Sequence, residues 1–473
     1  MTGATRREKD LLGEKEISSK AYYGIQTARA LENFPITGLK PHKGLIVALA
    51  MVKKAAALAN MELGTLSSVI GGAIVQAADE VIQGDLQEEF VVDVIQGGAG
   101  TSMNMNANEV LANRAIEILG GQKGDYRMVH PNNHVNMAQS TNDVFPTAIR
   151  IAALYLGAGL LEKLETMAEV CKDLAQRFDQ VIKMGRTHLQ DAVPIRLGQE
   201  FAAYGCMLAR DRERIKRALE SLLEINMGAT AVGTGLNADP YYIERVTFHL
   251  REISGFSLKR AANLVDATQN ADVYVEVSGQ LKTLAVNLSK LANDLRLMAS
   301  GPRTGLGEIN LPPVQPGSSI MPGKVNPVMA EVVNQVAFQV MGNDLTITRA
   351  AEAGQLELNV MEPVLTYNLL QSLDILRNSI DVFTSRCLTG ITANVECCRQ
   401  MVERSVGPIT AINPHVGHEV ASQVAREALA TGRSIREIIL ERGILTPEEL
   451  AVILDLYEMT EPGIAGKDLL RGR

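Results

Sequence analysis

Residues 317–327, "GSSIMPGKVNP", gather two serines, two glycines and one lysine into one short segment. Hydroxyls, permissive glycine backbone and a cation are also the parts of a phosphate-binding loop. In such a loop the glycines stand five positions apart and a hydroxyl residue follows the lysine. Here Gly317 and Gly323 are six positions apart, valine follows Lys324, and Pro322 removes one backbone N–H. The segment therefore fails as a phosphate loop, and taken alone it could be an ordinary flexible connector.

Three other segments carry hydroxyl and amide side chains with little charge. They are 97–109 ("GGAGTSMNMNANE"), 134–148 ("HVNMAQSTNDVFPTA") and 183–200 ("KMGRTHLQDAVPIRLGQE"). Singly, the first is also typical of a tight turn and the second of a helix N-cap. Together with 317–327 they indicate a polar pocket with one fixed cation, suited to a small carboxylate whose charge shifts during a reaction. The candidate residues are Thr101, Ser102, Asn104, Asn106, Ser140, Thr141, Asn142, Thr187 and His188.

Long helices must position these loops. Between residues 271 and 302, apolar residues recur at alternating steps of four and three from Val277 to Met298, which places them on one helical face. Gly301-Pro302 then predicts the end of that helix. Comparable patterns follow in 154–178, 197–225, 330–354 and 361–388. Five long helices predict a bundle with much side surface, which could bury its remaining apolar face against other copies of the chain.

We therefore expect a mainly α protein with three domains. Residues 1–140 form a mixed, mostly helical N-terminal domain, and residues 141–395 hold the central bundle of long helices. Residues 396–473 turn to shorter charged helices, such as "SIREIILERG" and "TPEELAVILDLYEM", and form a small C-terminal domain.

Charge and composition narrow the class of protein. The net charge of −8 argues against a general nucleic-acid or membrane-surface binder, although it leaves room for a small anionic substrate. The five cysteines form no CxxC pair, which favours free thiols in a reducing compartment. The N-terminal segment is charged, and the chain shows no run of about 18 apolar residues. We expect a cytoplasmic protein without a signal peptide or a membrane span.

These motifs resemble those of the aspartase/fumarase superfamily over essentially the whole chain. "GSSIMPGKVNP" is similar to the superfamily signature, and "GRTHLQDAVP" and "STNDVFPTA" also occur in class II fumarases. "AAEAGQLELNVMEPV" and "VVNQVAFQVMGNDLTIT" are more similar to aspartases. The resemblance implies the three-domain aspartase/fumarase fold, whose five central helices form a twenty-helix core in a homotetramer. It also implies that three subunits share each active site.

The resemblance to aspartases implies the reversible removal of ammonia from L-aspartate to give fumarate. The reaction is an anti-elimination through an enediolate, and no cofactor or metal is implied. Ser318 matches the base, acting as an alkoxide that the backbone around Gly317 and Gly323 and the charge of Lys324 stabilise. The implied ligands of the β-carboxylate are Thr101, Ser140, Thr141 and Ser319, those of the α-carboxylate are Lys324 and Asn326, and those around the amino group are Asn142, Thr187 and His188.

The role of His188 has two interpretations. In related fumarases the corresponding histidine pairs with a glutamate that matches Glu331 here, and such a pair could orient or charge the imidazole. Some aspartases carry glutamine at this position, so His188 is either an essential acid or only a binding residue. Two alternative functions also stay open: a class II fumarase, which uses nearly the same polar set, and a catalytically silent structural protein such as the lens crystallins of this superfamily.

Overall fold

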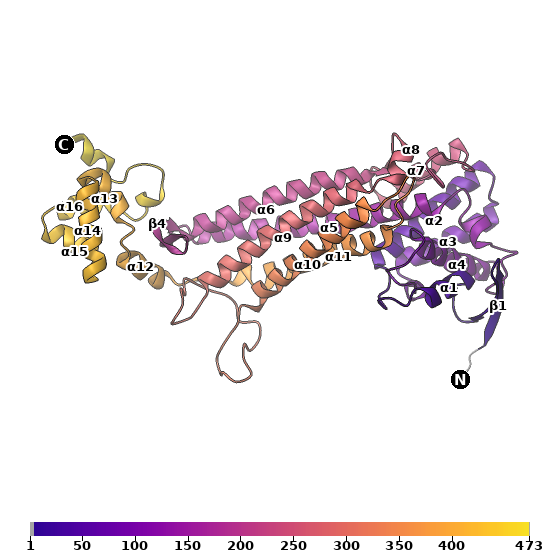
Figure 1. The fold of residues 1–473 in the computed structure, drawn as a ribbon, viewed down its shortest axis with the longest axis horizontal. Helices are drawn as coiled ribbons and strands as arrows, with labels where there is room; N and C mark the ends of the chain where they lie inside the picture. Colours follow the sequence, from indigo (N-terminus) through magenta and orange to yellow (C-terminus); the bar gives the residue numbers. More distant parts are fainter. Residues whose placement is uncertain (1–3, 473) are drawn as a thin grey trace. The chain divides into compact units, whose positions relative to one another are not determined.

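A computed structural model describes residues 4–472, and they are predominantly helical (Figure 1). The chain divides into two compact units. Unit 1 comprises Met1–Glu162, Asp211–Ala285 and Val336–Asn378, and unit 2 comprises Lys163–Arg210, Val286–Gln335 and Ser379–Arg473. The boundaries between the units pass through the long helices.

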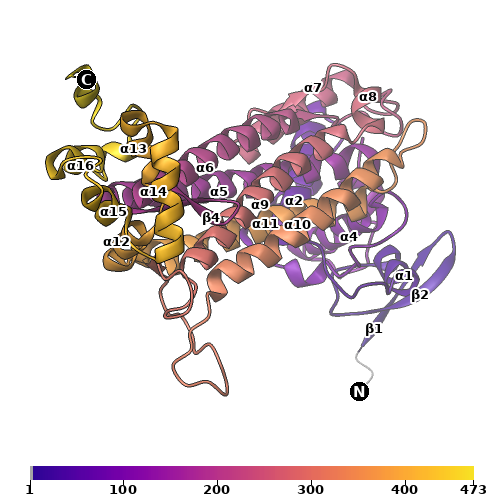
Figure 2. The same cartoon turned by 60° about the vertical axis from the view of Figure 1, so that its left-hand side comes forward.

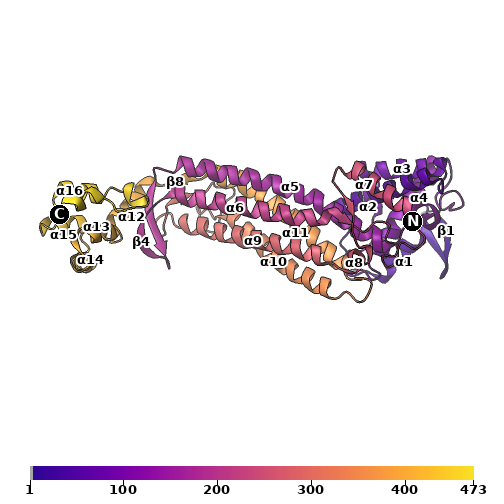
Figure 3. The ribbon, with the colours of Figure 1, turned by 90° about the horizontal axis from the view of Figure 1, so that it is seen from above.

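The five long helices that the sequence predicts are present. They are α5 (Thr141–Arg177), α6 (Leu197–Glu220), α9 (Asp272–Met298), α10 (Val328–Glu352) and α11 (Glu362–Arg386). The parts of these helices that belong to unit 1 run side by side (Figures 1 and 3). All seven apolar residues of the predicted α9 stripe are buried, and the helix ends three residues before Gly301. Periodicity thus identified both the helix and the face that it buries.

The start of α5 is fixed by its own side chains. The Ser140 Oγ accepts a hydrogen bond from the Asn142 N–H at 3.2 Å, and Asp143 Oδ1 accepts one from the Ser140 N–H at 2.9 Å. Such reciprocal bonds satisfy backbone N–H groups that have no partner within the helix. The predicted N-cap at this polar cluster is therefore confirmed. It also holds the three adjacent candidate residues, Ser140, Thr141 and Asn142, in one defined turn.

The rest of unit 1 packs shorter helices around α2. These are α1 (Ile25–Asn33), α2 (Lys43–Leu63), α3 (Ser68–Gln83), α4 (Thr101–Ile118), α7 (Pro240–Ser254) and α8 (Leu264–Gln269). A hairpin of β1 (Thr5–Asp10) and β2 (Gly13–Ser18) precedes them, and a short parallel pair, β5 (Glu224–Ile225) and β6 (Lys259–Arg260), follows α6. The helix α2 contacts α3, α4 and α7 and is the centre of this packing.

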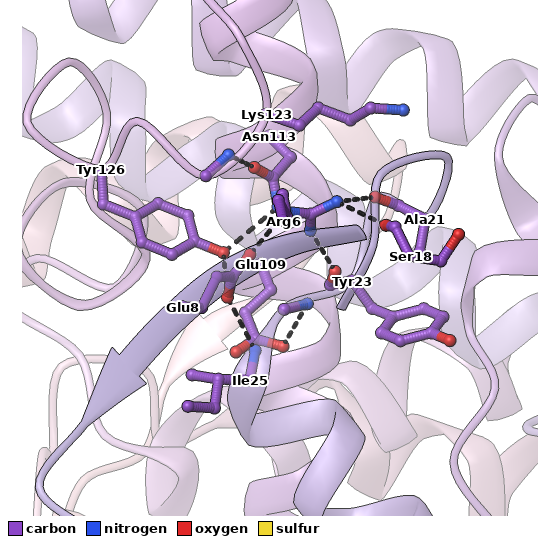
Figure 4. A network of polar contacts seen from close by, with 12 residues as sticks. Arg6, Glu8, Ser18, Ala21, Tyr23, Ile25, Glu109, Asn113, Lys123 and Tyr126 are labelled. Atoms are coloured by element: carbon purple, nitrogen blue, oxygen red, sulfur yellow. Dashed lines mark hydrogen bonds and ion pairs between the residues drawn. The ribbon is translucent and has the colours of Figure 1, made fainter. Parts of the chain in front are cut away.

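Two carboxylates, one on α4 and one on the N-terminal hairpin, hold the start of α1 (Figure 4). The buried Glu109 of α4 accepts hydrogen bonds from the backbone N–H groups of Gly24, Gln26 and Thr27 at 2.8–3.1 Å. Glu8 of β1 accepts one from the Ile25 N–H at 2.8 Å. Both acids therefore satisfy the free N–H groups at the start of α1, where negative charge is stabilising. Burial nevertheless raises the pKa of Glu109.

Unit 2 contains a hairpin and a set of short helices. The hairpin joins β3 (Ile182–Thr187) to β4 (Gln190–Arg196), and β7 (Ile309–Asn310) pairs with β8 (Thr392–Ala393). The helices are α12 (Val395–Arg404), α13 (Ile409–Val416), α14 (His418–Thr431), α15 (Ile435–Glu441) and α16 (Pro447–Ile453). The last four, which are drawn toward the yellow end of the colour scale in Figure 2, pack around one apolar cluster. Capping boxes at Ser434 and Thr446 begin the two short helices that the sequence predicts.

Two helices are long and apolar enough to cross a membrane, namely α2 and α5. In α2, 72% of the apolar window is buried inside the protein, and in α5 the share is 78%. Apolar surface that is already covered by protein is typical of core helices rather than of lipid-facing ones. Neither helix contains an uninterrupted apolar run of this length, because Lys53 and Lys54 interrupt α2 and Arg150 interrupts α5.

Candidate active site

The 317–327 loop closes on itself in unit 2. The Gly317 N–H donates to the Lys324 carbonyl oxygen at 2.8 Å, and the Asn326 side-chain amide donates to the Gly317 carbonyl oxygen at 2.6 Å. A Cβ at position 317 would lie 2.5 Å from the Lys324 oxygen, so only glycine allows this approach. Gly323 has a φ of +83°, which also favours glycine. The loop thus brings Ser318, Lys324 and Asn326 into one local structure.

The Ser318 hydroxyl lies where two backbone amides point. Its Oγ accepts hydrogen bonds from the N–H groups of Ile320 at 3.2 Å and Met321 at 3.0 Å. Donors that converge on one oxygen favour its ionised form, because they stabilise negative charge without a counter-ion. The same bonds also describe an ordinary turn in which serine binds its own backbone. The arrangement is therefore that of an ordinary turn, and it would also suit an alkoxide.

Lys324 and Ser319 are exposed on the same loop. Within residues 4–472, no acceptor lies within hydrogen-bonding distance of the Lys324 Nζ, and no carboxylate forms an ion pair with it. The only predicted cation of the pocket is therefore free to bind an anion from outside the chain.

Thr187 and His188 lie at the tip of the β3–β4 hairpin, and both are exposed. The two-residue turn is formed by His188 and Leu189, with φ values of +54° and +61°. Turns of this kind favour Asn-Gly, because residues with a larger side chain resist positive φ. Such strain recurs at functional sites, where the surrounding structure must maintain it. His188 and Leu189 therefore adopt a strained backbone conformation that the sequence around them does not predict.

A buried charge cluster holds the base of this hairpin. From β3, the Lys183 Nζ lies 2.9 Å from Glu200 and 3.1 Å from Glu308, and an Arg186 Nη lies 2.7 Å from Glu308. Glu308 is fully buried, and the two cations compensate its charge. This cluster was not predicted from the sequence, since Glu308 lies more than one hundred positions from both Lys183 and Arg186.

The remaining candidates lie in unit 1. Thr101 is exposed at the start of α4, where its Oγ donates to the Gly98 carbonyl oxygen at 2.6 Å. The Asn142 side chain donates to the Ala231 carbonyl oxygen at 2.7 Å. Asp143, which follows it, is fully buried and accepts the N–H groups of Gly228 and Thr230 at 3.1 and 3.0 Å. The 228–231 loop, absent from the predicted site, is thereby held against the turn that carries Ser140–Asn142.

A fully buried lysine lies behind that turn. The Lys53 Nζ donates to Asn136 Oδ1 and to Gln139 Oε1, both at 2.9 Å. Asn104 donates through Nδ2 to Asn136 Oδ1 at 3.2 Å and to Thr141 Oγ at 3.0 Å. Burial lowers the pKa of Lys53 and raises that of Asp143, and the attraction between their charges opposes both shifts. The sequence analysis named Asn104 and Thr141 but gave no signal for Lys53.

The predicted residues thus fall into two groups. Thr101, Ser140, Thr141 and Asn142 belong to unit 1, whereas Thr187, His188 and the 317–331 segment belong to unit 2. Glu331, in the first turn of α10, forms no ion pair with His188 within the described part of one chain. Between residues 4 and 472, no group of three His, Cys, Asp or Glu side chains is arranged to hold a metal ion.

Comparison with known proteins gives matches along almost the whole chain. The family described as "Lyase" matches residues 13–342, and "Fumarase C C-terminus" matches residues 409–461. The aspartate ammonia-lyase of Bacillus subtilis (strain 168) is 65% identical over 465 residues, which cover 98% of each chain. That of Escherichia coli (strain K12) is 49% identical over 470 residues, which cover 99% of this chain and 98% of the relative.

Solved structures share the fold. The fumarate lyase:delta crystallin from Brucella melitensis, in its cobalt-bound crystal structure, is 51% identical with a TM-score of 0.94, covering 97% of this chain and 100% of the other. The class II fumarase from Schistosoma mansoni is 37% identical with a TM-score of 0.93 and the same coverage. The fold is therefore shared with a class II fumarase, whereas sequence identity to the two aspartate ammonia-lyases, 49% and 65%, is higher than the 37% to that fumarase.

Proposed function

The chain belongs to the aspartase/fumarase superfamily of lyases, and we propose that it is an aspartate ammonia-lyase that converts L-aspartate reversibly to fumarate and ammonia. One observation carries the choice of substrate. Curated relatives that are 49–65% identical over nearly their full length are aspartate ammonia-lyases, whereas the matched class II fumarase structure is 37% identical. The fumarase alternative therefore has less support.

The difficult step is removal of a proton from the carbon next to the β-carboxylate. The resulting carbanion spreads into that carboxylate as an enediolate, which carries more negative charge than the bound substrate. Donors placed around it therefore bind the transition state more tightly than the ground state. We assign the proton abstraction to Ser318, because two backbone N–H groups already point at its Oγ. The enediolate then collapses, the C–N bond breaks, and ammonia leaves from the opposite face.

The other roles follow from the donors that each loop offers. Hydroxyls of Ser140, Thr141 and Ser319 suit the β-carboxylate, since each can donate a hydrogen bond to the developing charge. The Thr101 hydroxyl can join them by turning its hydrogen away from the Gly98 carbonyl oxygen. Lys324 and Asn326 suit the α-carboxylate, whose charge is constant through the reaction. Asn142, Thr187 and His188 remain for the amino group. No cofactor or metal takes part in this mechanism.

We propose that the protein assembles as a homotetramer in which three subunits complete each site. Two observations support the assembly. Phe338 and Leu345, seven residues apart on α10, are 62% and 64% exposed, so this helix presents apolar surface that a second copy could cover. Within residues 4–472, the side chains of Lys324 and His188 also form no hydrogen bond or ion pair, as expected for groups completed by neighbours. The five free cysteines favour a reducing, cytoplasmic location.

A spectrophotometric assay tests the proposed activity. Purified protein is incubated separately with L-aspartate and with L-malate, and the absorbance of fumarate is followed. We expect fumarate from L-aspartate, with release of ammonia in equal amount. Turnover of L-malate alone would instead identify a fumarase, and no turnover of either would favour a structural role.

His188→Gln is expected to reduce kcat by less than about tenfold, well below the 10²–10⁴-fold contribution of an essential acid. Glutamine keeps a hydrogen-bond donor near the amino group, and ammonium is a good enough leaving group without a further proton. Steady-state rates of fumarate formation measure the effect. A loss above about 10²-fold would instead identify His188 as the acid.

A further inference from the structure

We propose that Lys53 and Asn104 are positioning residues that fix the direction of a hydrogen-bond chain and thereby make the Thr141 hydroxyl a donor toward the substrate carboxylate. The inference rests on the proposed function only in naming that carboxylate. Its structural part concerns buried amides behind α5, all of them within unit 1.

The chain begins at a group that donates to both of its partners. The Lys53 Nζ carries at least two N–H groups whether or not it is charged, so Asn136 and Gln139 turn their amide oxygens toward it. Backbone carbonyls, which can only accept, impose the same orientation from the other side. The Asn136 Nδ2 donates to the Gln139 carbonyl oxygen at 3.2 Å, and the Gln139 Nε2 donates to those of Val135 and Met137 at 3.0 and 3.1 Å.

The direction passes from Asn136 to α4. The Asn136 Oδ1 that points toward Lys53 also accepts hydrogen bonds from two side-chain amides of α4. They come from Asn104 at 3.2 Å and from Asn108 at 3.1 Å. The two asparagines must therefore present their amide nitrogens. Their Oδ1 atoms are both buried and have no hydrogen-bond partner in the described part of the chain, which costs free energy. Because the protein tolerates this cost at two neighbouring residues, we infer that the packing maintains the orientation of their amide groups.

The chain ends at the candidate site. The same Asn104 nitrogen donates to the Thr141 Oγ at 3.0 Å. A hydroxyl that accepts there keeps its own hydrogen for another partner, and no hydrogen bond donated by Thr141 Oγ is formed within residues 4–472. The hydrogen bond from Asn104 therefore leaves the Thr141 hydroxyl free to donate its own hydrogen to another group. Free rotation of the hydroxyl would instead let it alternate between donor and acceptor, and an acceptor would repel a carboxylate.

Asn104→Asp tests the direction of the chain, because aspartate has nearly the same shape but accepts where asparagine donates. The Thr141 hydroxyl should then donate inward to Asp and no longer to the substrate. We expect KM for L-aspartate to rise about 10- to 100-fold, as for loss of a hydrogen bond to a charged group. The dissociation constant of succinate, measured by calorimetry without turnover, should rise by a similar factor.

Asn108→Asp is the matched control. Asn108 lies one turn further along α4, is fully buried and also donates to Asn136, but it has no bond to Thr141. The variant Asn108→Asp introduces the same charge as Asn104→Asp but removes no bond to Thr141. Its effect on KM and on succinate binding should therefore be much smaller. Equal effects of the two variants would overturn the inference.

A double-mutant cycle gives the second arm. Thr141→Val should raise KM as much as Asn104→Asp, and the double variant should add nothing further, since both changes remove one donation. Additive effects would contradict the proposed chain. If Asn104→Asp does not fold, as judged by its melting temperature, Asn104→Leu replaces it, and an unchanged succinate affinity there would also refute the inference. Failure of the unmodified protein to release fumarate would reject the activity alone, because succinate binding still reports on the chain.

Discussion

Ser318→Ala is expected to abolish fumarate formation, with kcat reduced about 10³- to 10⁴-fold, while the protein keeps its fold and its assembly state. The Ser318 Oγ is the only side-chain oxygen of the loop on which two backbone N–H groups converge within the described chain. Its removal takes away the proposed base and leaves those donors pointing at an empty position. Steady-state kinetics, size-exclusion chromatography and thermal melting measure the three properties.

Ser319→Ala is the control for this prediction. The neighbouring hydroxyl lies on the same exposed loop but has no converging backbone donors among residues 4–472, and we assign it to the β-carboxylate. Its loss should weaken binding and slow turnover without abolishing it. Retention of a near-normal rate by Ser318→Ala, or an equal loss in both variants, would reject Ser318 as the base.

The architecture was predictable because helical periodicity depends on residues close in sequence. The α9 stripe is one example, since each of its members lies three or four positions from the next and all are buried. The N-cap at Ser140 is another, because it depends on four consecutive residues. The division of the chain at residues 140 and 395 stays a prediction, since the boundaries of the two compact units fall elsewhere, within the long helices.

The parts that escaped prediction depend on contacts between distant residues. Lys53 reads as an ordinary apolar-helix lysine next to Lys54, yet the first is fully buried against Asn136 and the second pairs with Asp79 near the surface. The strained turn at His188 is local, but it was not predicted either, because the dipeptide His-Leu is not typical of a tight hairpin turn. Polar residues on helices and loops acquire their roles from the partners that the fold supplies.

The candidate residues are divided between the two units, so variants of different units can be mixed to test whether subunits share a site. Residues of unit 1 offer hydroxyls and amides, whereas unit 2 supplies Ser318 and the free cation Lys324. If subunits exchange these parts, variants with one lesion in each unit, such as Thr141→Val and Ser318→Ala, should together show more activity at low aspartate concentration, when mixed after dissociation, than either variant alone. Only an assembly that combines parts of different chains can rebuild an intact site from such a mixture.

Lys324→Met is expected to raise KM for L-aspartate by roughly 30- to 5,000-fold, which corresponds to about 2–5 kcal/mol for breaking a desolvated charge pair. The α-carboxylate keeps its charge throughout the reaction, so its partner binds ground state and transition state alike. Loss of such uniform binding raises KM more than it lowers kcat. Initial rates over a wide range of aspartate concentration separate the two constants.

Two controls distinguish this role from a structural one. Lys324 is exposed and makes no hydrogen bond or ion pair through its Nζ within the described chain, so its replacement should change the free energy of unfolding by less than about 0.5 kcal/mol. Lys324→Arg keeps the charge but changes its shape, and should restore part of the lost affinity. An unchanged KM in Lys324→Met would mean that another group holds the α-carboxylate. A fall in kcat with KM constant would instead place the lysine beside Ser318, where its charge would serve the alkoxide.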